Sequence, residues 1–211
     1  MTPGSFSHVF GRALRGMPCT VVGLGRDPVG LPVDEWTRPA DADDLRLLDL
    51  CEGPTLDIGC GPGRLTAALA ERGHVSLGID VVREAVGQTR GRGASALRRD
   101  VFDLLPGEGR WRTALLADGN VGIGGDPVAL LRRIRMLLDP RGRVVVEVGP
   151  DGTGCRTEWA ALVCDGARSR PFRWSVVGVD AIGAVAEGAG LSVSGIYAHG
   201  RRHSAVLEES R

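Results

Sequence analysis

Residues 55–64 read TLDIGCGPGR, and a second apolar run over residues 75–79 ends at Asp80. The first run predicts a buried strand over 55–58, followed by a glycine-rich turn and a helix over 65–71. Open α/β sheets bind ligands at the carboxyl ends of their strands, and glycines let a ligand lie against bare backbone there. A carboxylate at the end of the second strand can bind two vicinal ribose hydroxyls. The unit therefore predicts a nucleoside ligand.

The spacing of the glycines separates the classes of nucleoside site. A dinucleotide site expects G-x-G-x-x-G, but the third glycine position is Arg64 here and the turn reads G-x-G-x-G. A phosphate-binding loop of the G-x-x-x-x-G-K-[ST] type needs a lysine, and the chain contains none. The pattern therefore disfavours a nicotinamide site and excludes that phosphate loop.

Together with Asp57, two residues before the first glycine, this turn resembles motif I of the class I S-adenosylmethionine-dependent methyltransferases. The resemblance implies S-adenosylmethionine as the cofactor, with Asp57 holding its cationic amino acid end and Asp80 binding its ribose. The cofactor-binding positions predicted in this region are Asp57, Gly59, Cys60, Gly61, Gly63, Asp80 and Val81.

Two further stretches follow the order of the family. Residues 99–103 read RDVFD, where the resemblance implies that Asp100 accepts from the adenine amine and that the Val101 amide donates to a ring nitrogen. The alternative is that Asp100 only caps a turn. Strand four, residues 113–117, ends beside the topological switch point, so Asp118 and Asn120 are expected to face the sulfonium and the acceptor.

Asp118 is the first candidate for a general base, which is needed only if the acceptor must lose a proton. It is also predicted to contact the cofactor, and in the alternative reading it only binds the cofactor's amino group or caps its loop. His199 is a distant second candidate. Asn120 is predicted to contact the acceptor.

Strands and helices alternate along the chain, as in a doubly wound α/β fold. Five parallel strands are followed by a closing antiparallel pair, which predicts a seven-stranded, mainly parallel sheet of order 3-2-1-4-5-7-6 with helices on both faces. The whole chain, residues 1–211, is expected to form one methyltransferase domain. A β-hairpin insertion is expected after strand five, around an Asp-Gly turn in residues 149–177.

Two segments outside the cofactor unit are expected to hold the substrate. Residues 1–40 are expected to form a lid, with Trp36 and Arg38 as candidate contacts, and the insertion contributes Trp159 and Trp174. The alternative for all four is ordinary packing on the domain surface or against the sheet.

Composition narrows the choice of partners and compartment. Formal net charge is zero, and all 26 basic residues are arginine, so no general nucleic acid or anionic membrane footprint is expected. The five cysteines form no C-x-x-C pair, which argues against a zinc ribbon. We expect a cytoplasmic protein with reduced thiols, without a membrane span or a metal site.

The resulting prediction is methyl transfer from S-adenosylmethionine to a small-molecule acceptor. One alternative is a methyltransferase-like protein that has lost catalysis and serves as a binding or partner protein. A nicotinamide-dependent oxidoreductase is the other, disfavoured by Arg64 and by the closing antiparallel strands. The acceptor, the methylated atom and the choice between monomer and dimer stay open.

Overall fold

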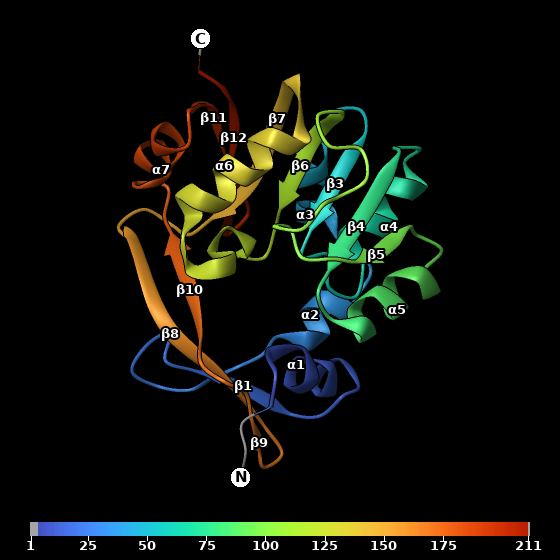
Figure 1. Ribbon diagram of the computed structural model, residues 1–211, viewed down its shortest axis with the longest axis vertical. Coiled ribbons are helices and arrows are strands. Elements are labelled where there is room, and N and C mark those ends of the chain that lie inside the picture. Colours follow the sequence, from blue (N-terminus) through green and yellow to red (C-terminus); the bar gives the residue numbers. More distant parts are fainter. Residues whose placement is uncertain (1–3, 211) are drawn as a thin grey trace.

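The computed structural model describes residues 4–210 and is built on a seven-stranded sheet (Figure 1). The strands follow the order β11-β12-β7-β6-β3-β4-β5, and β12 runs antiparallel to the other six. The predicted order 3-2-1-4-5-7-6 is confirmed. The strands are β3 (Thr55–Ile58), β4 (Ser76–Asp80), β5 (Ala96–Arg98), β6 (Trp111–Leu116), β7 (Leu138–Val148), β11 (Leu191–His199) and β12 (Arg202–Glu209).

Helices cover both faces of this sheet. Successive side chains of β7 pack against helices on opposite faces. Val144 and Val146 pack in the core cluster formed with α6 (Pro127–Leu137) and α7 (Ile182–Gly188). Val145 points to the opposite cluster, with α3 (Ala42–Leu48) and α4 (Arg64–Glu71). The helix α5 (Arg83–Gly91) follows β4 and packs beside α4. Since successive strand residues point to opposite faces, β7 is buried on both sides.

The helix boundaries follow from residues at their ends. The Asp126 side chain accepts from the Ala129 amide, and Pro127 occupies the first turn of α6, as predicted. A capping box at the start of α3 joins Asp41 to Asp44 through both backbone amides. This capping box fixes the side chain of Asp44 as well as the start of the helix, and Asp44 lies beneath the candidate site described below.

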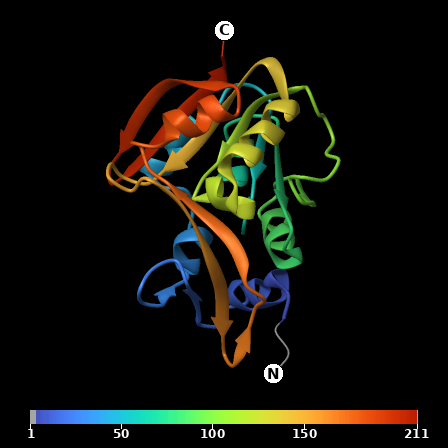
Figure 2. The ribbon, with the colours of Figure 1, turned by 60° about the vertical axis from the view of Figure 1, so that its left-hand side comes forward.

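A second sheet lies beside the first and was only partly predicted. The hairpin around Asp165 and Gly166 is present, with β8 (Cys155–Cys164) paired to β9 (Ala167–Arg168) and to β10 (Phe172–Val177). The free edge of β8 pairs with β1 (Cys19–Val22), which pairs in turn with β2 (Val29–Gly30). Helices α1 (Phe6–Leu14) and α2 (Val33–Thr37) complete this layer. Figures 1 and 2 show β8 and β10 leading from the large sheet to the N-terminal elements.

The expectation of reduced thiols is corrected at one pair of cysteines. Cys19 of β1 and Cys164 of β8 are direct register partners, and a disulfide joins them across 145 positions of sequence. The sequence carried no signal for this bond because the strand pairing that brings the two cysteines together is long-range. Cys51, Cys60 and Cys155 are free thiols.

Within residues 4–210, the structure contains no helix of the length and apolarity required to cross a bilayer.

Candidate cofactor and acceptor site

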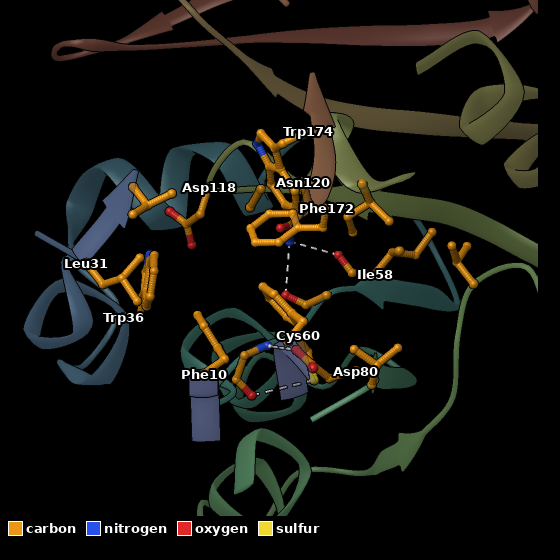
Figure 3. A pocket seen from close by; sticks show the side chains of 18 of the residues that line it. Phe10, Leu31, Trp36, Ile58, Cys60, Asp80, Asp118, Asn120, Phe172 and Trp174 are labelled. Carbon is orange, nitrogen blue, oxygen red and sulfur yellow. Dashed lines mark hydrogen bonds between the residues drawn. The ribbon is translucent and has the colours of Figure 1, made fainter. Parts of the chain in front are cut away.

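One cavity of about 710 Å³ lies between the carboxyl ends of β3, β4 and β6 and the second sheet (Figure 3). Its volume falls within the ordinary range for small-molecule sites, about 300 to 1,000 Å³. The structure brings together in its lining most of the residues that the sequence singled out near the motif, namely Asp57, Gly59, Cys60, Gly61, Asp80, Val81, Asp100, Val101, Asp118 and Asn120.

The carboxylate of Asp80 is held by backbone amides. One oxygen accepts from the Gly61 amide at 3.0 Å and the other from the Val82 amide at 2.8 Å, so Asp80 ties the glycine loop to the start of α5. Burial raises the pKa of Asp80, and these amides oppose the shift. Each carboxylate oxygen has a second lone pair, which leaves capacity for two hydroxyl donors from the cavity.

Asp57 is 2% exposed and has fewer partners. Its Oδ2 accepts from the hydroxyl of Thr66 at 2.6 Å. Burial raises the pKa of Asp57 to about 7, and the negative charges of Asp118 and Asp80 contribute to the increase. A buried carboxyl of this kind favours a cation beside it, because a positive charge would offset the cost of ionisation.

The glycine loop leaves room for a ligand. Gly61 has φ of +53°, and a Cβ built there would meet no atom within 4 Å, so this part of the loop presents open backbone to the cavity. At Gly59 a Cβ would lie 2.7 Å from Nδ2 of Asn120, which donates to the carbonyls of Ile58 and Gly59 at 2.9 Å each. These positions fit the amino acid end of S-adenosylmethionine.

Gly63 has a packing role in this structure. It does not line the cavity, and a Cβ there would lie 2.6 Å from the Thr89 hydroxyl of α5. Gly63 was predicted to contact the cofactor, but it is not among the residues that line the cavity.

At the other end of the motif, Asp100 is exposed and its Oδ1 accepts from the Phe102 amide at 3.0 Å. The turn-capping alternative thus describes an observed bond, and Asp100 lines the cavity as well, next to the buried Val101. Its second carboxylate oxygen is free of protein hydrogen bonds among the described residues, and an adenine amine would suit it.

A buried network of ion pairs supports the loop from below. Arg64 is 4% exposed and donates from Nη2 to both oxygens of Asp118, at 2.7 and 3.0 Å, while its Nη1 pairs with Asp44. Arg202, from the start of β12, donates to Asp44 at 2.5 Å and to Glu147 at 2.7 Å. Arg38 also pairs with Asp44. Burial would raise the pKa of the Asp44 carboxyl, but the three arginines and the Asp41 amide hold it well below its ordinary value.

Sequence reasoning missed this network because its members are far apart along the chain. The one available signal was Arg64, a charge placed directly after the glycine turn at the start of an otherwise apolar helix.

Asp118 occupies a strained position at the end of β6. Its φ is +51°, and its amide donates to the Glu147 carboxylate at 2.7 Å. Burial raises the pKa of Asp118, the pairing with Arg64 opposes that increase, and Glu147 adds to it. The carboxylate thus faces the cavity as a paired anion.

Aromatic rings line the side of the cavity away from the motif. Phe6 and Phe10 of α1 stack at 5.3 Å, Phe6 meets Phe172 edge-on at 4.9 Å, and Phe10 lies 5.7 Å from Trp36. Trp174 continues the series, 6.3 Å from Phe172. The predicted contacts Trp36 and Trp174 therefore lie in one wall. The two α1 phenylalanines were missed, although their i, i+4 spacing places them on one helix face.

Two other candidates for substrate contact do not lie in this wall. Trp159 lines the cavity at its edge and is 66% exposed. Arg38 does not line the cavity, because Glu35, Asp41 and Asp44 bind its guanidinium.

His199, the second candidate for a base, is buried away from the cavity, where Nε2 bonds to the Ser204 hydroxyl at 2.9 Å. Among the described residues, no group of three or more His, Cys, Asp or Glu side chains is arranged to hold a metal ion.

Comparisons with known proteins agree with this geometry. Residues 55–142 match the family model described as "Methyltransferase domain". A trans-aconitate 2-methyltransferase from Sinorhizobium fredii is 34% identical over 124 residues, which cover 56% of this chain and 46% of that protein. The chain thus matches about half the length of this curated relative.

Solved structures share the fold over a larger part of the chain. A SAM-dependent methyltransferase from Bacteroides fragilis, in complex with S-adenosyl-L-homocysteine, aligns with a TM-score of 0.80 at 20% identity, over 97% of this chain and 94% of that one. The 1,6-didemethyltoxoflavin-N1-methyltransferase of Burkholderia thailandensis aligns with a TM-score of 0.61 at 20% identity, over 84% and 82% of the two chains. The motif, the sheet order and the match of residues 55–142 to the methyltransferase family model agree, and the chain is similar in sequence and in fold to S-adenosylmethionine-dependent methyltransferases.

Proposed function

We propose that this protein transfers a methyl group from S-adenosylmethionine to a small-molecule acceptor. The observation that carries the proposal is the continuity of one cavity, which joins the carboxylates and open glycine backbone of the motif to a wall of aromatic rings. A cofactor and an acceptor in the two halves would meet near Asp118 and Asn120. The similar trans-aconitate and didemethyltoxoflavin enzymes, whose names describe small-molecule methyl acceptors, support the same proposal.

The chain's own residues would bind and orient the reactants. Asp80 would accept from the ribose hydroxyls and Asp100 from the adenine amine, while Asp57 and the loop backbone would hold the amino acid end. Asn120, fixed by its bonds to β3, would keep the end of the loop in place. Bound S-adenosylmethionine supplies an activated methyl group, so the protein contributes mainly orientation and the exclusion of water, worth about 7 kcal/mol or more.

Asp118 is our candidate for the residue that takes a proton from the acceptor, where the acceptor has one to lose. Its place at the junction and its raised pKa support this role, and its pairing with Arg64 limits its basicity. Asp118→Asn is expected to keep cofactor affinity and to lower turnover about 100-fold.

That loss should shrink as the pH rises enough to ionise the acceptor without help. Asp151→Asn, at an exposed turn outside the cavity, is the matched control. Lost cofactor affinity with unchanged turnover would make Asp118 a binding residue instead.

The proposed activity is tested with S-adenosylmethionine carrying an isotopically labelled methyl group and a library of small acceptors. We expect label in an acceptor together with formation of S-adenosylhomocysteine. Cofactor binding without label transfer to any acceptor class would favour the alternative of a methyltransferase-like binding protein.

We also propose that the protein acts in the cytoplasm on a free small molecule, without a nucleic acid or membrane partner. The zero formal net charge supports the absence of a nucleic acid or anionic membrane partner. The disulfide between Cys19 and Cys164 stands against the cytoplasm, because such bonds are rare where thiols are kept reduced. Fractionation of cells that express the protein, followed by immunodetection, tests it.

A further inference from the structure

The half of the cavity beyond the motif, which we call the acceptor half, is formed by six aromatic side chains and by aliphatic side chains of the second sheet. The aromatic members are Phe6, Phe10, Trp36, Trp159, Phe172 and Trp174. They come from α1, α2, β8 and β10. Figure 3 shows Phe10, Trp36, Phe172 and Trp174 of this group around the cavity.

These aromatic rings are not buried in the hydrophobic core. Five of them are partly exposed and Trp159 is largely exposed, although large aromatic residues in a packed interior are highly buried. The contacts between neighbouring rings are both stacked and edge-on, so the wall offers ring faces and ring edges at the same place. A flat aromatic ligand could continue either kind of contact.

The buried charged groups that line the cavity lie outside the acceptor half or are already paired. Arg64 binds both oxygens of Asp118. Within residues 4–210, the one charged side chain that lines the cavity from the second sheet is Arg173, which is exposed to solvent. A carboxylate carried by an acceptor would therefore lose water without gaining a buried cation, which is costly.

We propose that the acceptor is an uncharged, flat aromatic molecule that stacks among these rings with its nucleophilic atom toward Asp118 and Asn120. This proposal rests on the proposed methyl transfer, which it deepens by naming the class of substrate. The pocket would select against anionic acceptors such as polycarboxylates.

Calorimetry on protein saturated with S-adenosylhomocysteine tests the proposal without requiring turnover. The probes are 2-naphthol, 6-hydroxy-2-naphthoate, which adds a charge to the same rings, and decahydro-2-naphthol, which has the same carbon skeleton without aromaticity. We expect 2-naphthol to bind about tenfold more tightly than either of the others, as ring stacking and carboxylate desolvation would produce.

Phe10 lies between Phe6 and Trp36, so Phe10→Leu keeps an apolar side chain and removes the central ring. This variant is expected to weaken 2-naphthol binding about tenfold and to leave S-adenosylhomocysteine binding unchanged. Tyr197→Ala removes an exposed aromatic side chain outside the cavity and is the matched control. Circular dichroism of each variant checks that it folds.

The outcomes separate the two proposals. Equal or tighter binding of the naphthoate or of the decahydro compound, or undiminished 2-naphthol binding by Phe10→Leu, would overturn the aromatic acceptor and leave the cofactor site intact. Absence of S-adenosylhomocysteine binding by the wild-type protein would instead contradict the proposed function itself.

Discussion

The three carboxylates at the ends of β3, β4 and β6 differ in what holds them. Asp80 is bound by two backbone amides, Asp57 by one hydroxyl, and Asp118 by the guanidinium of Arg64. Their environments therefore predict different responses to substitution and to pH, although all three are acids placed at strand ends.

For Asp80 we expect Asp80→Ala to weaken S-adenosylhomocysteine binding about tenfold or more, because the ribose hydroxyls lose a charged acceptor in a partly desolvated site. Calorimetry measures the affinity, and Asp151→Ala, at an exposed turn, is the control. Asp80→Asn keeps the shape of the side chain, so it tests whether affinity is lost through the missing charge rather than through a disordered glycine loop. Unchanged affinity in both Asp80 variants would show that the ribose does not lie there.

Asp57 predicts a pH dependence of cofactor binding. Its raised pKa, about 7, means that binding a cationic amino acid end must expel a proton at acidic pH. Affinity for S-adenosylhomocysteine is therefore expected to rise from about pH 6 to about pH 8. Asp57→Asn should flatten this dependence.

The raised pKa of Asp57 has the opposite effect on folding stability, which is expected to fall as the pH rises. The contribution of Asp57 to stability is present at low pH and is lost as the pH rises through about 7, so unfolding must be measured at each pH. An equal pH slope in the wild-type protein and in Asp57→Asn would exclude Asp57 as the titrating group.

The helices and strands that could be predicted from sequence were those whose ends are marked by residues close by in the chain. The strand β3 matches its predicted bounds because an apolar run ends in glycines, and α6 starts where the Asp126 and Pro127 signal placed it. The hairpin of β8 was readable from its Asp-Gly turn.

The pairing of β1 with β8 was not predictable in this way. Short strands with partly buried faces carry little alternation, and their partner lies more than a hundred residues away. The same distance hid the network of Arg64 and Arg202 and the phenylalanines of α1, so the cofactor half was predicted far better than the acceptor half.

The disulfide between β1 and β8 gives a prediction about this layer. Reduction, or Cys164→Ser, is expected to lower the free energy of unfolding by about 2–4 kcal/mol, because the bond closes a long loop. Chemical denaturation checks the loss, and Cys155→Ser, at an exposed free thiol, is the control. Titration of five thiols in the unfolded, unreduced protein would show that the bond does not form.

At the scale of the whole molecule, two sheets enclose one cavity, and each sheet lines it with a different kind of group. The large parallel sheet presents carboxylates and open glycine backbone at its carboxyl edge, and the second sheet with α1 and α2 presents aromatic rings. Figure 2 shows the long strands β8 and β10 that connect the two layers. The arrangement fits a cofactor on one side and an apolar acceptor on the other.

The central claim is that this cavity binds S-adenosylmethionine rather than a nicotinamide dinucleotide. Parallel calorimetric titrations of the wild-type protein with S-adenosylhomocysteine and with NAD test it most directly. We predict saturable binding of S-adenosylhomocysteine with one site per chain and no heat of binding for NAD, since Arg64 stands where a dinucleotide loop needs its third glycine. Saturable binding of NAD without binding of S-adenosylhomocysteine would contradict the account.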